Sequence, residues 1–148
     1  AKSRDARAHN YMAKYGDPVL PPFWTMKEFL TFGAAVRFYA LLSNAIKTAV
    51  AQDFGMPTHE VLTNWLECLV DLRNVCAHHD RLFNRIFQKQ PSRLRRQNLP
   101  TAPVNKLKAR LECLDHLLTS RGLAGGRVAA VQALLTRYPD VQPAEVGY

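Results

Sequence analysis

The sequence of this 148-residue chain predicts an all-α helical bundle. Apolar residues recur every three or four positions in several stretches, as they do on the buried face of an amphipathic helix. Proline and glycine separate these stretches, and no segment shows the alternating pattern of a half-buried strand. The apolar fraction of 47% is enough for a hydrophobic core, so we expect residues 1–148 to form a single helical domain.

The first two helices are expected over residues 3–15 and 23–42. Gly16-Asp17-Pro18 should end the first, because proline cannot continue a helix. In the second, Thr25-Met26-Lys27-Glu28 has the sequence of a capping box, in which the Thr hydroxyl and the Glu carboxylate each satisfy a free backbone N–H group. We also expect Gly33 to permit the close approach of a neighbouring helix.

The next two helices have clear start signals. Ser43 is expected to cap a third helix that stops at Gly55-Met56-Pro57, and Thr58 is expected to cap a fourth. The fourth helix should be the central core element and should run on into the Arg73–Arg85 segment. Its apolar side chains recur at helical spacing: Val61, Leu62, Trp65, Leu66, Leu69, Leu72 and Val75.

The rest of the chain predicts a loop and two further helices. Residues 88–103 contain three prolines and should form a basic loop. Helices are expected over residues 104–120, with Gly122 as the stop, and over residues 128–138. Side chains on apolar faces should complete the core: Trp24, Trp65, Cys68 and Cys113.

Positive charge is concentrated in the second half of the chain. The net charge is +8, but residues 1–80 hold equal numbers of basic and acidic side chains. From Arg81 to Arg110 there are nine basic residues and no acidic one. Such a stretch is typical either of a surface that binds a polyanion or of a solvated basic face.

Several classes of protein do not fit the sequence. No apolar run approaches the roughly 20 residues of a membrane span, and the charged N-terminal segment does not resemble a signal peptide. Three widely spaced cysteines fit a reducing compartment better than a disulfide framework. We therefore expect a cytoplasmic protein that does not associate with membranes.

The segment Arg73–Arg85 carries the strongest functional signal. Imidazole exchanges protons near neutral pH, and guanidinium holds a phosphate with a planar fork of donors. Together these groups suit cleavage of RNA by its own 2′-hydroxyl. The candidate catalytic residues are Arg73, Asn74, His78 and His79, and the candidate RNA-binding residues are Arg81, Arg85, Arg93, Arg95 and Arg96.

The geometry of an ideal helix limits how these residues meet. If the fourth helix continues, His78, Arg81 and Arg85 share one stripe, whereas Arg73 lies about 140° from His78 around the axis. A complete site then needs either a kink near Ala77 or a second copy of the helix.

Structural roles remain open for the same residues. His78 suits a capping or core-polar role, and Arg73 suits an ion pair with Asp71 or Glu67. A metal site built from Cys76, His78, His79 and Asp80 has poor ligand spacing, so no metal or other cofactor is expected.

Three stretches resemble a known family: Pro21 to Gly33, Trp65 with its following leucines, and above all Arg73 to Arg85. They resemble the Abi-like abortive-infection proteins of the AbiD/AbiF type, in the HEPN superfamily of bacterial phage defence. The resemblance extends over about Tyr15 to Tyr148 and is to the C-terminal half of those proteins.

The resemblance implies a HEPN-like all-α bundle, often a homodimer that brings two motifs together, and metal-independent RNA cleavage. HEPN ribonucleases share an Arg, a short spacer and a His, which Arg73, Asn74 and His78 match, while His79 also satisfies the spacing. The leading hypothesis is thus an endoribonuclease of phage defence or a toxin. A non-catalytic RNA-binding module and a protein–protein dimerisation scaffold are the alternatives.

Three partners follow from this hypothesis: RNA, a second copy of the chain, and an antitoxin or regulatory RNA. A two-fold homodimer would place the two Arg73–Arg85 segments against each other. Leu82 and Phe83 are the candidates for part of that interface.

Overall fold

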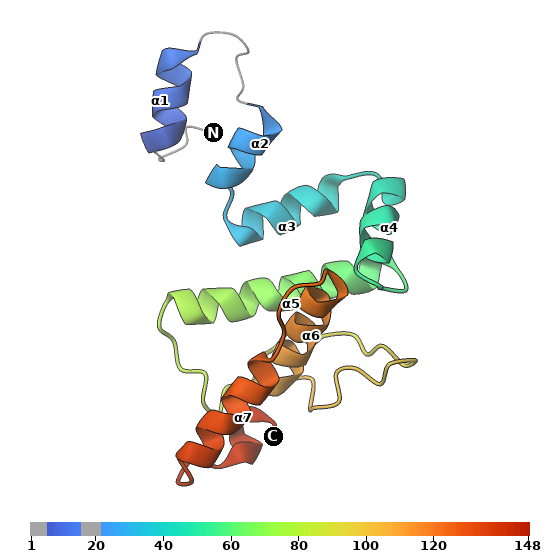
Figure 1. The fold of residues 1–148 in the computed structure, drawn as a ribbon, viewed down its shortest axis with the longest axis vertical. Helices are drawn as coiled ribbons and strands as arrows, with labels where there is room; N and C mark the ends of the chain where they lie inside the picture. Colours follow the sequence, from blue (N-terminus) through green and yellow to red (C-terminus); the bar gives the residue numbers. More distant parts are fainter. Residues whose placement is uncertain (1–5, 16–21) are drawn as a thin grey trace.

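A computed structural model describes residues 6–15 and 22–148, and it is helical without a strand in those residues (Figure 1). The prediction of an all-α fold is therefore confirmed. The elements are α1 (Ala6–Lys14), α2 (Phe23–Met26), the 3-10 helix η1 (Lys27–Phe29), α3 (Phe32–Leu41), α4 (Asn44–Asp53), α5 (His59–Ala77), α6 (Leu107–Ser120), α7 (Arg127–Arg137) and the 3-10 helix η2 (Pro143–Val146). The predicted stop at Gly16-Asp17-Pro18 lies outside the described residues.

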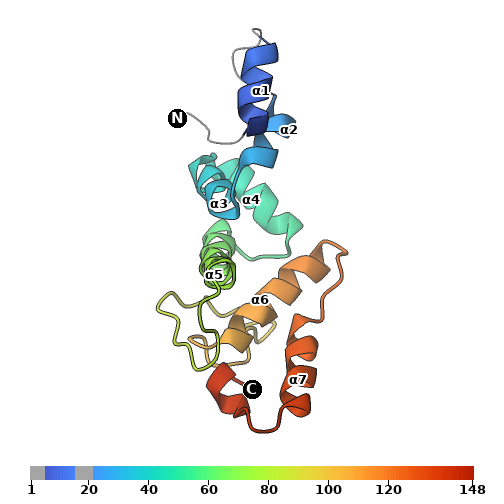
Figure 2. The ribbon, with the colours of Figure 1, turned by 90° about the vertical axis from the view of Figure 1, so that its left-hand side faces the viewer.

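Helices α3, α4 and α5 form one layer, in which α3 lies along α5 and α4 joins their ends (Figures 1 and 2). The hydroxyls of Thr31, Ser43 and Thr58 accept backbone N–H groups in the first turns of α3, α4 and α5. The caps predicted at Ser43 and Thr58 are thus confirmed. Gly33 faces α5, as predicted, and a Cβ added there would lie 3.4 Å from a methyl group of Val70, which is still an ordinary contact distance.

The predicted helix over residues 23–42 is wrong, because the chain breaks between η1 and α3. Leu30 is extended, and Thr31 caps α3 by accepting the Ala34 N–H group at 3.1 Å. Thr25 lies inside α2, so the expected capping box does not form. A threonine that hydrogen-bonds the backbone ahead of it competes with continued helix, which explains the new start at Thr31.

Trp24 is a second correction, because its side chain is 68% exposed instead of part of the core. Figure 1 shows α2 on the side of α3 away from α5, and none of the four residues of α2 is buried. An aromatic pair connects α2 with α3, in which the ring centres of Phe23 and Phe38 lie 5.4 Å apart.

The core is built around α5, as predicted. Trp65 and Cys68 of α5 and Cys113 of α6 are completely buried. The Trp65 indole N–H donates to the Ser92 carbonyl at 2.7 Å, which satisfies its polar atom, and its ring meets the His116 ring edge-on at 5.6 Å. Three of the four side chains expected to complete the core are therefore confirmed.

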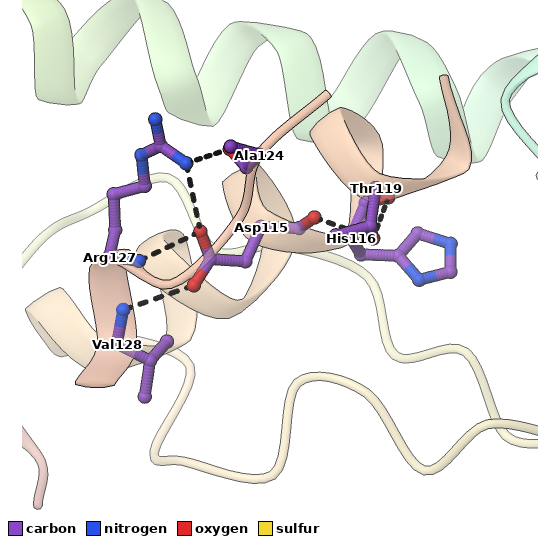
Figure 3. Close-up of polar contacts among 6 residues, drawn as sticks. All are labelled: Asp115, His116, Thr119, Ala124, Arg127 and Val128. Atoms are coloured by element: carbon purple, nitrogen blue, oxygen red, sulfur yellow. Dashed lines mark hydrogen bonds and ion pairs between the residues drawn. The ribbon is translucent and has the colours of Figure 1, made fainter. Parts of the chain in front are cut away.

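Helices α6 and α7 confirm the last two predicted helices and pack against each other (Figure 2). The Asp115 carboxylate in α6 accepts the backbone N–H groups of Arg127 and Val128, each at 3.0 Å (Figure 3). One helix thereby caps the next, because free N–H groups at a helix start favour an anionic acceptor. Gly125 permits this approach, since a Cβ there would lie 2.9 Å from the Thr119 methyl group.

The predicted loop over residues 88–103 is irregular, with one isolated bridge between Leu94 and Leu99. It is also partly buried, because Leu94, Pro100 and Ala102 lose nearly all solvent contact. In the part of the chain that the structure describes, no helix is long and apolar enough to cross a membrane.

Arg110 is completely buried in α6, which corrects its inclusion in a basic surface. Its guanidinium lies 3.7 Å from the centre of the Phe87 ring and donates to the carbonyls of Lys89 and Val104. Burial lowers its pKa from the ordinary value, but a guanidinium has so high a pKa that it stays charged. This cation therefore serves as an internal clamp.

Replacing this clamp tests its structural role. Arg110→Met keeps most of the volume but leaves the carbonyls of Lys89 and Val104 without their donors. The free energy of unfolding should fall by about 1–3 kcal/mol in urea denaturation. Amide exchange in residues 88–106 should rise more than in α5. The control is Arg137→Met, on the exposed end of α7, for which we expect a change within about 0.5 kcal/mol. An equal loss of unfolding free energy in the two variants would contradict the structural role of Arg110.

Candidate functional site

Helix α5 ends at Ala77 because two hydrogen bonds turn the chain out of the helix. The His79 N–H donates to the Cys76 carbonyl at 3.2 Å, and the Asp80 N–H donates to the Val75 carbonyl at 2.9 Å. His79 itself has a φ of 55°. These are the bonds and the left-handed residue of a Schellman motif, in which glycine is the usual residue.

The predicted continuation of this helix is therefore wrong. Beyond the motif the chain is irregular, and Asn84 is again left-handed, with a φ of 49°. His78, Arg81 and Arg85 do not share a helical stripe. A kink near Ala77 was one of the two ways to complete the site, and the structure has a complete stop of the helix there instead.

Two pockets adjoin at the end of α5. The first, of about 250 Å³, is lined by His78, Asp80 and Arg85. The second, of about 550 Å³, lies between α3 and α5 and is lined by Arg73. The first is completed by Asp71, Asn74, Val75, Ile86, Phe87 and Gln88, and the second by Thr31, Gly33, Ala34, Val36, Arg37, Ala40, Glu67, Val70, Asp71, Asn74 and Lys89.

The two pockets share one wall, formed by Asp71 and Asn74. Asn74 is joined to Arg73, whose guanidinium donates to the Asn74 side-chain oxygen at 3.1 Å. The structure thus brings Asn74 beside both Arg73 and His78, while these two line different pockets. This arrangement agrees with the divergence predicted from the helix geometry.

The ion pairs suggested for Arg73 do not form. Glu67 instead accepts a hydrogen bond from Lys89 at 2.6 Å, and this bond raises the pKa of the lysine from its ordinary value. Asp71 has no ion-pair partner within the described residues. Arg73 therefore keeps donors available for an anion, because the amide of Asn74 occupies only part of its fork.

His78 and His79 differ in position. His78 is the C-cap residue of α5 and lines the first pocket, whereas His79 lines neither pocket. The left-handed backbone gives His79 a structural role as the residue that ends the helix. Histidine is one of the residues that tolerate this conformation better than most.

The candidate RNA-binding arginines do not form one uniform surface. Arg85 lies 3.9 Å from Asp80 and donates to the Arg81 carbonyl at 3.4 Å, and Arg93 donates to the Pro100 carbonyl at 2.9 Å. The other three are exposed, and their side chains make no hydrogen bond or ion pair with described residues: Arg81, Arg95 and Arg96.

The expected interface residues differ as well. Leu82 is half-buried against the core, whereas the Phe83 side chain is 41% exposed. Only Phe83 of this pair presents a large apolar surface to a partner.

Arg37 and Asp71 are charged lining residues that the sequence analysis did not name as functional candidates. Arg37 and Gly33 are four positions apart and thus share a face of α3, which is the signal that could have identified Arg37. Among residues 6–15 and 22–148, no group of three or more His, Cys, Asp and Glu side chains lies close enough to hold a metal ion.

The profile of the Abi-like protein family matches residues 1–84, more than half of the chain. The chain therefore belongs to the Abi-like protein family. No curated protein and no solved structure gives a significant match. The matched region includes the candidate catalytic residues, whereas Arg85 and the arginines of the 88–103 loop lie beyond it.

Substitutions at His79 test whether its backbone or its ring matters for the fold. The free energy of unfolding of His79→Gly should equal or exceed that of the parent protein, because glycine adopts a positive φ without a steric cost. His79→Ala should lose about 1 kcal/mol, because alanine resists the left-handed region. At His78, where φ is −94°, glycine should bring no gain. Urea denaturation checks all three, and an alanine variant at least as stable as the glycine variant would contradict the motif.

Proposed function

We propose that the protein is a metal-independent endoribonuclease of the HEPN type that acts in abortive infection or as a toxin. One observation carries the proposal. Asn74 stands between the pocket lined by Arg73 and the pocket lined by His78, within the segment that the family profile matches. Membership of the Abi-like family supports the role in abortive infection. The RNA chemistry follows from the residue types, and the site of action would be the cytoplasm.

The chemistry assigns one role to each residue. His78 takes the proton of the RNA 2′-hydroxyl while the 2′-oxygen attacks the adjacent phosphorus. Arg73 stabilises the negative charge that builds on the phosphorus oxygens, and Asn74 orients the phosphate. The bond between phosphorus and the 5′-oxygen breaks, and that oxygen takes a proton from water, while His78 returns the proton it removed to the solvent. The products are a 2′,3′-cyclic phosphate and a 5′-hydroxyl, and DNA, which has no 2′-hydroxyl, is spared.

Water-facing arginines would hold the RNA backbone, both near the His78 pocket and on the 88–103 loop, which is bonded to Asn64 and Trp65 in the first half of α5. Arg81, Arg95 and Arg96 carry charge without a partner among the described residues, and Arg85 lines the His78 pocket. Arg93 is tied to the Pro100 carbonyl and contributes its remaining donors. Contacts of this kind bind phosphates regardless of sequence and weaken with salt through counterion release.

We further propose a homodimer, because Arg73 and His78 of one chain line different pockets. A two-fold axis near the end of α5 would bring Arg73 of one copy to His78 of the other. Phe83 offers exposed apolar surface for that contact. Positive charge on both copies opposes association, and bound RNA would offset this repulsion. An antitoxin or a regulatory RNA would cover the same surface to hold the enzyme inactive.

Cleavage in the presence of EDTA tests the proposed chemistry. The parent protein should cut single-stranded RNA, and His78→Ala should lose about 100-fold or more in rate. Arg73→Lys should stay impaired, because a point charge does not reproduce the planar guanidinium fork. His9→Ala, on the exposed surface of α1, is the matched control and should cut normally. Mass spectrometry of the products identifies their ends.

The other outcomes separate the remaining functions. Equal cutting of DNA, or products with a 5′-phosphate, would contradict the mechanism. RNA that is shifted in a gel but intact would indicate a non-catalytic binding module. Neither shift nor cleavage would favour a dimerisation scaffold.

A further inference from the structure

The pocket between α3 and α5 contains an arginine from each helix, Arg37 and Arg73. Neither guanidinium has a carboxylate within ion-pair distance among the described residues. Of the two acidic groups in the lining, Glu67 is already bound to Lys89 at 2.6 Å. Apart from the Lys89–Glu67 pair, two cations thus share one groove with a single carboxylate that has no ion-pair partner among the described residues, that of Asp71.

Small side chains keep this groove open. Gly33, Ala34 and Ala40 line it from α3, and the Gly33 backbone lies close to Val70 of α5. Arg37 stands one turn beyond Gly33 on the same face of α3. Its side chain is exposed, so its charge is available to a ligand in the groove.

The dimensions and charges fit a nucleic-acid strand better than an isolated anion. The groove volume of about 550 Å³ exceeds what one phosphate fills, and its wall at Asp71 and Asn74 is also the wall of the His78 pocket. Guanidinium groups bind phosphates through paired N–H donors. The Asp71 carboxylate repels phosphate but accepts a hydrogen bond, so a ribose hydroxyl suits that position.

We propose that the groove between α3 and α5 holds the backbone of the RNA strand next to the cleaved bond, with Arg37 as a phosphate-binding residue beside Arg73. This inference rests on the proposed function, because it takes RNA as the ligand. Arg37 contacts a phosphate that does not react, so it contributes to binding more than to the chemical step. The strand then passes Asn74 toward the catalytic histidine.

The test measures binding of a single-stranded RNA oligonucleotide by fluorescence anisotropy in a His78→Ala background, in which the RNA stays intact. Arg37→Gln should weaken binding about tenfold at low salt, which corresponds to the loss of one charge-assisted contact. Arg37→Lys should weaken it less, because the charge remains without the fork. Lys27→Glu, at an exposed position of η1 outside the groove, is the control and should bind within about twofold of the parent.

A kinetic measurement complements binding in the protein with His78 intact. Arg37→Gln should raise KM about tenfold with little change in kcat. RNA binding and cleavage that are unchanged by Arg37→Gln would overturn the groove assignment and leave the proposed function standing. A parent protein that neither binds nor cuts RNA would overturn both. A loss equal to that of Lys27→Glu would show general electrostatics and would also overturn the assignment.

Discussion

The hydrogen bonds of the buried Arg110 guanidinium are the interactions on which the irregular segment between α5 and α6 depends, and this segment forms part of the candidate site. The chain between α5 and α6 has no regular structure apart from one bridge, so its backbone carbonyls need partners from elsewhere. Arg110 donates to the carbonyls of Lys89 and Val104, at two widely separated points of this segment. An unpaired polar group inside the protein would cost free energy, and the guanidinium removes that cost at both points.

The same cation connects the core to the site through the Phe87 ring. Arg110 lies 3.7 Å from the ring centre, and Arg85 lies 5.7 Å from it. Phe87 and Arg85 both line the pocket of His78. A buried charge in α6 therefore fixes an aromatic ring, and the ring fixes one wall of the pocket.

Helix α5 holds the loop from its other side. The Trp65 indole N–H donates to the Ser92 carbonyl. The side-chain NH₂ group of Asn64 donates to the Gln90 carbonyl, and its side-chain oxygen accepts the Ser92 N–H group. The loop arginines beyond these contacts are thus exposed on an ordered backbone. Ordered donors lose less conformational entropy on binding a phosphate than donors on a mobile chain.

The sequence predicts those features that depend on local pattern. The cap at Thr58 and the buried stripe through Trp65 follow from residue type and helical spacing, and so does the divergence of Arg73 from His78. The end of α5 escaped prediction because a histidine, and not a glycine, takes the left-handed position. The burial of Arg110 escaped it because charge counts do not show which cation meets backbone carbonyls. Arg37 joins the groove through the packing of α3 on α5, and its spacing from Gly33 marks a shared helix face without showing what that face packs against.

The most direct measurement mixes two inactive variants, Arg73→Ala and His78→Ala, and follows RNA cleavage after exchange of subunits. A mixed dimer retains Arg73 on one chain and His78 on the other. If these residues act together across a two-fold axis, mixing should restore part of the activity that neither variant shows alone, and light scattering should show the mass of a dimer. A mixed dimer of confirmed mass that stays inactive would contradict a site shared between two chains.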